Sequence, residues 1–68
     1  MFNQELINFM KNSLDNGEHS VDCNSRDIED LEKMKKEGYI EKYDRTNNIN
    51  EVGEEEVIFY PTRKFKEL

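Results

Sequence analysis

Two side chains that commonly bind metals, His19 and Cys23, lie four residues apart in this chain. A structural zinc site needs four ligands, usually cysteine thiolates and histidine nitrogens. The chain has one histidine and one cysteine, so carboxylates would have to complete the set. We therefore expect no metal and no cofactor. A single cysteine also excludes an internal disulfide, which favours a reducing, cytoplasmic environment.

Carboxylates are the other groups able to do chemistry, and the chain has sixteen of them on Asp and Glu side chains. A carboxylate that acts as a general acid needs a pocket that raises its pKa. A chain of 68 residues is too short to enclose such a pocket beside its core. The chain has no second histidine and no nucleophile motif that would indicate another catalytic mechanism. We therefore expect a non-enzymatic protein that acts by binding.

The charge balance restricts the class of partner. Sixteen acidic and ten basic side chains give a net charge of −6. Such a protein is repelled on average by nucleic acid and by anionic membranes, and it is attracted to basic surfaces. Repeated carboxylates can also imitate the phosphates of DNA, or they can simply keep a small protein in solution. The acids expected to contact a partner protein are Asp27, Glu29, Asp30 and Glu32.

Basic residues are the candidates for contact with nucleic acid, and they are Arg26, Lys42, Arg45, Arg63, Lys64 and Lys66. Tyr39, Tyr43 and Tyr60 are close to several of them in the sequence. On a surface that combines basic side chains with aromatic rings, the basic groups can contact a nucleic-acid backbone and the rings can stack on the nucleobases of a single strand. The alternative, which we favour, is a solvated tail beside aromatic rings that cover the core.

Two amphipathic helices are expected to position these groups. Residues 2–15 place apolar side chains on one face at 3.6 residues per turn, and Asn16-Gly17 supplies a stop. The second helix begins at Asn24 or Ser25, since either side chain can accept a hydrogen bond from the first turn. It ends at Gly38. The apolar residues of the first helix are Phe2, Leu6, Ile7, Phe9, Met10 and Leu14.

A β-hairpin is expected after Gly38. Residues 39–43 alternate, which would place Ile40 and Lys42 on the same face, and residues 45–53 read as a polar loop. Residues 56–60 read as the return strand, which Pro61 ends. Residues 19–24 are either a short edge strand that pairs with the hairpin or a loop. Thr62 is a candidate cap for a helical turn at residues 63–68, where Phe65 would pack on the core.

The segment LEKMKKEGYIEKY, followed by EEEVIFYPTRKFKEL, resembles winged helix-turn-helix proteins. In that family a recognition helix ends at a Gly-aromatic-Ile sequence, two wing strands follow, and a Thr-started helix comes after the second strand. Residues 17–24 are too few for the additional helix of the complete motif. The resemblance therefore implies a truncated winged helix, and the alternative is another small α+β fold with a helix packed on a hairpin.

We accordingly expect a single α+β domain over residues 1–68, winged-helix-like, with two helices packed on a β-hairpin and a short C-terminal helical turn. At this length only about 60% of the unfolded chain's surface can be buried. A homodimer, or docking on a larger partner, would add stability to so small a core.

The leading functional hypothesis is a small cytoplasmic regulatory protein, encoded by a phage or a mobile element, that binds a partner protein through its acidic helix face and hairpin. The alternative is a transcriptional regulator that contacts DNA through the wing and the basic tail. We expect no membrane contact, because no apolar run approaches the roughly 20 residues that span a bilayer. The first residues also lack the pattern of a signal peptide.

Overall fold

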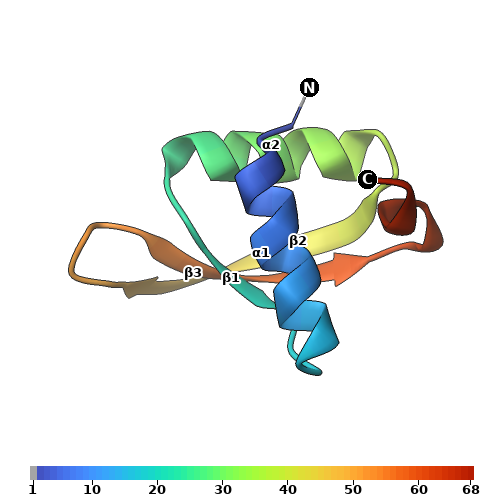
Figure 1. The fold of residues 1–68 in the computed structure, drawn as a ribbon. Coiled ribbons are helices and arrows are strands. Elements are labelled where there is room, and N and C mark those ends of the chain that lie inside the picture. The colour runs from blue at the N-terminus through green and yellow to red at the C-terminus, as the bar shows by residue number, and fades with distance from the viewer. Residues whose placement is uncertain (1) are drawn as a thin grey trace.

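Two helices lie on a three-stranded antiparallel sheet in the computed structural model, which describes residues 2–68 (Figure 1). The strand order is β1-β3-β2, so β3 is central and the other two strands are edges. The expected α+β class, with helices on a hairpin and a short C-terminal helical turn, is confirmed. The elements are α1 (Gln4–Asp15), β1 (Ser20–Cys23), α2 (Ser25–Lys36), β2 (Ile40–Ile49), β3 (Glu55–Pro61) and a 3₁₀ helix (Arg63–Glu67).

The ends of α2 show why this segment is helical. The Asn24 side chain accepts a hydrogen bond from the Asp27 N–H at 2.9 Å, and the Asp27 carboxylate accepts one from the Asn24 N–H at 3.2 Å. This reciprocal pair satisfies two backbone donors that the first turn leaves free. Asn24 is therefore the cap, and Ser25 is the first helical residue. Gly38 follows the helix with φ of 85°, a conformation that glycine adopts without strain.

Residues 20–23 form a strand, which settles the question that the sequence leaves open. β1 pairs antiparallel with β3, and Val21 is opposite Val57. On its other side, the Ser20 N–H donates to the Ser13 hydroxyl of α1 at 3.1 Å. Both partners are distant in sequence or on another element, so the strand depends on tertiary packing.

The β2–β3 hairpin is longer and less regular than the sequence suggests. β2 continues to Ile49, where a loop from residue 45 was expected, and the tip projects beyond both helices (Figure 1). The pairing register shifts between Ile40 and Lys42. Ile40 is buried and Lys42 is exposed, so the expectation that they share a face is wrong. A bulge inserts an extra residue and reverses the alternation beyond it.

The core lies between the helices and one face of the sheet. Phe59 of the central strand is fully buried, and its ring centroid is 6.2 Å from that of Phe65. The predicted packing of the C-terminal segment on the core is thus confirmed for Phe65, which is 2% exposed. The buried hydrophobic side chains are Leu6, Ile7, Met10, Val21, Cys23, Leu31, Met34, Ile40, Val57, Phe59 and Phe65.

Two residues differ from their expected roles. Phe9, predicted on the buried face of the first helix, is 53% exposed. It lies beside the short strand β1, with which it lines an open groove. Thr62 makes no capping hydrogen bond with its side chain. Its hydroxyl instead lies 2.6 Å from the Gly38 carbonyl oxygen and 3.0 Å from that of Tyr39, which ties the end of β3 to the end of α2.

Within residues 2–68, no helix combines the length and the apolar character needed to cross a membrane.

Candidate functional site

Asp27, expected on an acidic docking face, is 8% exposed and belongs to the capping pair with Asn24. Its carboxylate accepts a hydrogen bond inside the protein, so it is not presented to a partner. The expectation of a surface role for Asp27 is therefore wrong. The sequence contains the signal for this outcome, because an Asn followed three residues later by an acid is a helix-start pattern.

Two further acids of α2 also bind within the chain. Asp30 accepts a hydrogen bond from the Asn3 N–H at 2.9 Å, which fixes the start of α1. Glu32 accepts one from the Tyr43 hydroxyl at 2.8 Å, and this bond, with the neighbouring Lys35, lowers the pKa of Glu32. The Lys35 ammonium is 3.4 Å from the Glu32 carboxylate.

Glu29 is the member of the set whose side chain is exposed on the helix. The acidic face of α2 therefore serves mainly to hold α1 and β2 in place. As a docking surface it is smaller than the sequence indicates.

The basic residues lie on separate elements, and several are also engaged. The Lys64 ammonium donates to the Glu37 carbonyl oxygen at 2.8 Å and lies 4.5 Å above the Tyr39 ring. The Lys42 ammonium lies 4.9 Å from the centroid of the Tyr60 ring. Arg26 is exposed in the first turn of α2, and Arg63 and Lys66 are exposed on the 3₁₀ helix.

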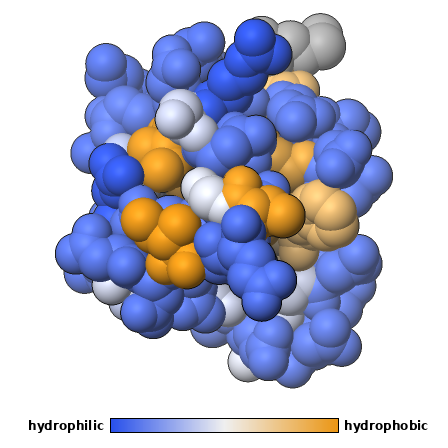
Figure 2. All heavy atoms as spheres, turned by 90° about the vertical axis from the view of Figure 1, so that its left-hand side faces the viewer, coloured by the Kyte–Doolittle hydropathy of each residue, from blue (hydrophilic) through white to orange (hydrophobic). Residues whose placement is uncertain are grey.

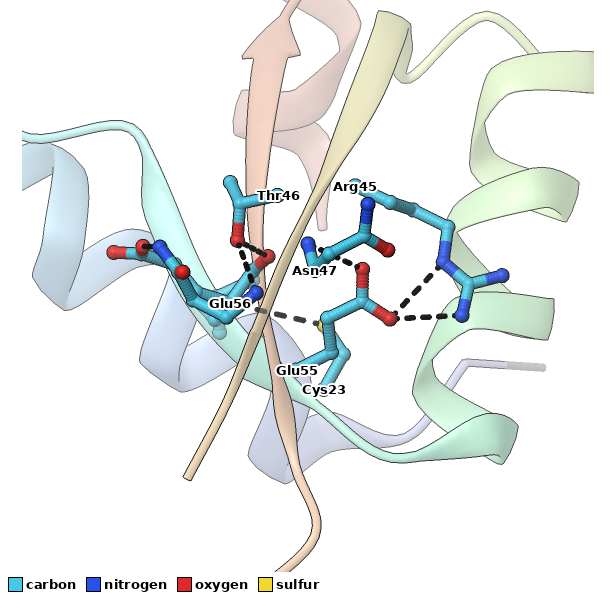
Figure 3. Close-up of polar contacts among 8 residues, drawn as sticks. Cys23, Arg45, Thr46, Asn47, Glu55 and Glu56 are labelled. Carbon is cyan, nitrogen blue, oxygen red and sulfur yellow. Dashed lines mark hydrogen bonds and ion pairs between the residues drawn. The ribbon is translucent and has the colours of Figure 1, made fainter.

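Arg45 is bound to a buried carboxylate that the sequence analysis missed (Figure 3). Glu55, the middle one of three consecutive acids in the sequence, is 6% exposed. Its Oε1 accepts hydrogen bonds from Arg45 Nε at 3.2 Å and Nη2 at 2.8 Å, and its Oε2 accepts one from the Asn47 N–H at 3.1 Å. These bonds lower the pKa of Glu55 and raise that of Arg45.

This Glu55 clamp explains the irregular part of β2. Asn47 has a φ of 65°, a left-handed conformation that asparagine tolerates better than most residues. The Thr46 hydroxyl also donates to the Glu56 carbonyl oxygen at 2.7 Å (Figure 3). The carboxylate and the hydroxyl together hold the bulge between Arg45 and Ile49. The geometry indicates a structural role in shaping the hairpin.

His19 and Cys23 do not form a site. Cys23 is buried, and burial, followed by the nearby Asp27 carboxylate, raises the pKa of its thiol to about 12. His19 is exposed, with its ring centroid 6.5 Å from that of Phe59. In the part of the chain that the structure describes, no three His, Cys, Asp or Glu side chains are grouped so as to hold a metal ion.

Exposed apolar side chains provide the clearest sign of a binding surface. Ile49 is 66% exposed and Val52 is 78% exposed, both at the hairpin tip, and Phe9 is 53% exposed on α1. Figure 2, which views the molecule from the hairpin tip, shows hydrophobic side chains gathered among hydrophilic ones. Sequence reasoning missed this surface, because Phe9 was assigned to the core.

An open groove lies next to Phe9, between α1 and β1. Its α1 side is formed by Glu5, Phe9 and Ser13, which are four residues apart and so share one helix face. Its β1 side is formed by residues 20–22, and Glu54 also lines it. We call this feature the α1–β1 groove.

Comparison of the sequence with known protein families, with curated proteins and with solved structures gives no match.

Proposed function

We propose that this chain is a small acidic regulatory protein that acts by binding another protein, without catalysis. The observation that carries the proposal is the exposure of three large apolar side chains, Phe9, Ile49 and Val52. Exposed apolar surface rimmed by polar residues marks interaction sites in soluble proteins. The net charge of −6 favours a partner with a basic surface.

The binding surface proposed is the hairpin tip together with the adjoining face of α1, and α2 is secondary. Asp27, Asp30 and Glu32 already accept hydrogen bonds within the chain. Breaking those bonds to bind a partner would cost free energy, because each donor would lose its acceptor. The apolar side chains of Ile49 and Val52 at the hairpin tip are exposed, so a partner could contact them without breaking such bonds.

DNA binding through the wing and tail has less support. Arg45 is bound to Glu55, and Lys64 donates to a backbone carbonyl oxygen. In α2 the bases Arg26 and Lys33 share the lining of an open surface depression with the acids Glu29 and Asp30, which offset their charge. A helix that binds in a DNA groove needs Arg, Lys, Asn or Gln side chains at its N-terminal end, where it contacts the edges of the nucleobases.

Affinity purification with the tagged full chain tests the proposal. From cells of the source organism it should return one stoichiometric protein. A Phe9→Ser, Ile49→Ser, Val52→Ser variant should lose that protein, since it removes the exposed apolar groups. A Glu29→Lys variant and a Lys42→Gln, Arg63→Gln variant are the controls, and both should retain it.

The alternative is tested with duplex DNA at about 50 mM salt, where electrostatic affinity is strong. We expect no retardation of the duplex. Retardation that weakens steeply with added salt, and that Lys42→Gln, Arg63→Gln abolishes, would overturn the protein-binding proposal in favour of a DNA-binding regulator. If the triple serine variant still captures the protein partner as well as the unmodified chain does, that result would also count against the proposed surface.

A further inference from the structure

The α1–β1 groove combines an apolar wall with a rim whose charged side chains are all acidic. Phe9 supplies an aromatic ring that is half-exposed. Glu5, Asp22 and Glu54 contribute three carboxylates to the lining, and no basic side chain of the described residues lines it. The volume of the groove is about 380 Å³, near the lower end of the ~300–1,000 Å³ range of ligand pockets. It is thus suited to one or two side chains of a linear segment.

The backbone of β1 adds a direction to this groove. The Phe59 N–H donates to the carbonyl oxygen of His19, just before β1, at 2.8 Å, so Val21 and Cys23 are the β1 positions whose backbone groups face β3. In an antiparallel pair the intervening residues direct their N–H and C=O groups to the opposite edge. Asp22 therefore presents a backbone donor and acceptor on the groove side of β1.

The α1 side limits how much of that edge is open. The Ser20 N–H is already bonded to the Ser13 hydroxyl at 3.1 Å. This contact closes the end of the groove at the C-terminal half of α1. The groove opens from there toward Glu5 and Glu54, which are respectively exposed and half-buried. An occupant would enter along the uncovered part of β1, beside Phe9.

We infer that the α1–β1 groove binds an extended basic segment of a partner protein. An apolar side chain of that segment contacts Phe9, flanking Lys or Arg side chains contact Glu5, Asp22 and Glu54, and its backbone bonds to Asp22. The inference rests on the proposed function and specifies the site and the chemistry of the partner. Charge complementarity selects the occupant, because three carboxylates surround one apolar contact without a cation of the chain's own.

A second copy of this chain fits the groove poorly. Its two most basic four-residue segments are residues 33–36 and 63–66, with three bases each, and the apolar residues within them are Met34 and Phe65. Met34 is fully buried, so it cannot serve as an anchor. Phe65 is 2% exposed and packs on Phe59, so it cannot serve as an anchor while the chain is folded. The net charge of −6 also sets two copies in repulsion.

Selection of random peptides displayed on phage, against the immobilised full chain, tests the inference. The enriched peptides should combine one or more apolar residues with at least two Lys or Arg and should lack acids. The most enriched peptide is then synthesised, and its affinity for the chain and for variants is measured by fluorescence anisotropy. Amide chemical shifts of the labelled chain locate where it binds.

Phe9→Ala should weaken that peptide about tenfold or more, as removal of an aromatic anchor usually does. Glu5→Gln and Asp22→Asn should each weaken it about two- to fivefold, with the loss shrinking at high salt. Glu67→Gln and Glu29→Gln, at exposed positions outside the groove, are matched controls, and both should leave the affinity within about twofold. The largest shift changes should fall in residues 5–13 and 20–22.

Three results would overturn the groove as the site. They are enriched peptides without basic residues, an affinity unchanged by Phe9→Ala and Asp22→Asn, and no enrichment at all. A peptide weakened by Val52→Ala but not by Phe9→Ala would move the site to the hairpin tip and leave the proposed function standing. If sedimentation shows a dimer that Phe9→Ala dissociates, the occupant is a second copy. If the unmodified full chain captures no stoichiometric protein in the purification described above, that result would instead overturn the proposed function itself.

Discussion

Arg45 of β2 and Glu55 of β3 form an ion pair across the two strands, and both Nε and Nη2 of Arg45 donate to the same carboxylate oxygen of Glu55. The other carboxylate oxygen accepts the Asn47 N–H at 3.1 Å. The Glu55 carboxylate is almost fully buried, whereas the Arg45 side chain is 56% exposed. The pair thus stabilises the bulged part of β2, and the arginine side chain covers the carboxylate and shields it from water.

This pair should make the stability of the hairpin depend on pH. The pKa of Glu55 is lowered in the folded protein by the Arg45 and Asn47 hydrogen bonds. A lowered folded pKa gives stability that is present above the unfolded pKa of about 4.3 and is lost as pH falls through the folded value. Glu55→Gln should therefore lower the urea midpoint at pH 7, and its difference from the wild type should shrink in acid.

Urea unfolding followed by circular dichroism between neutral and acid pH measures this difference. Glu51→Gln, at an exposed position of the hairpin turn, is the matched control and should change the midpoint little. Glu32 also has a lowered pKa, but it is present in every variant and cancels in the comparison. A Glu55→Gln deficit that stays constant with pH would show that the charge of Glu55 does not stabilise the fold.

The cap of α2 gives a prediction with a neighbouring control. Asn24→Ala removes the acceptor of the Asp27 N–H and should destabilise the protein by about 1 kcal/mol. Ser25→Ala replaces the first helical residue, whose side chain is exposed, and should change stability by less than about 0.5 kcal/mol. Thermal or urea unfolding of the two variants compares them directly. Equal losses would mean that the cap is shared.

Phe9 and Phe59 are the same residue type in opposite environments. Phe59 is fully buried on the central strand, so Phe59→Ala should cost about 3–5 kcal/mol, enough to unfold much of so small a protein. Phe9 is 53% exposed, so Phe9→Ala should cost less than about 1 kcal/mol. Amide dispersion in NMR spectra and the unfolding midpoint distinguish the two. If the Phe9→Ala variant unfolds, Phe9 contributes to the core and its exposed placement is wrong.

Cys23 offers a probe of the intact fold. Its thiol is buried, and its pKa is raised to about 12 by burial and by nearby carboxylates, Asp27 first among them. Only the thiolate reacts readily with iodoacetamide, so labelling at pH 8 should be slow in the folded protein and fast in urea. Mass spectrometry of the labelled fraction over time measures the rate. Rapid labelling without denaturant would indicate frequent opening between β1 and α2.

The sequence by itself determined the elements with strong local signals. α1 and α2 follow from apolar periodicity, and their ends follow from residues with special backbone roles, such as Asn24, Gly17 and Gly38. The return strand and the C-terminal turn with Phe65 were likewise readable, because Pro61 and the apolar run leave few alternatives. These features depend on neighbours within a few positions, which a sequence displays.

Only the tertiary structure decided the features that depend on distant partners. Residues 20–23 became a strand because β3 and Ser13 supply its hydrogen bonds, and β2 continued to Ile49 because β3 holds a polar strand without an apolar face. Glu55 reads as one of three consecutive acids, and its burial depends on Arg45 ten residues away. Phe9 reads as core, and its exposure depends on how little of α1 the four-residue strand β1 covers. The candidate binding surface arises from these long-range placements, since a hydrophobic pattern fixes which helix face is apolar but not what covers its margin.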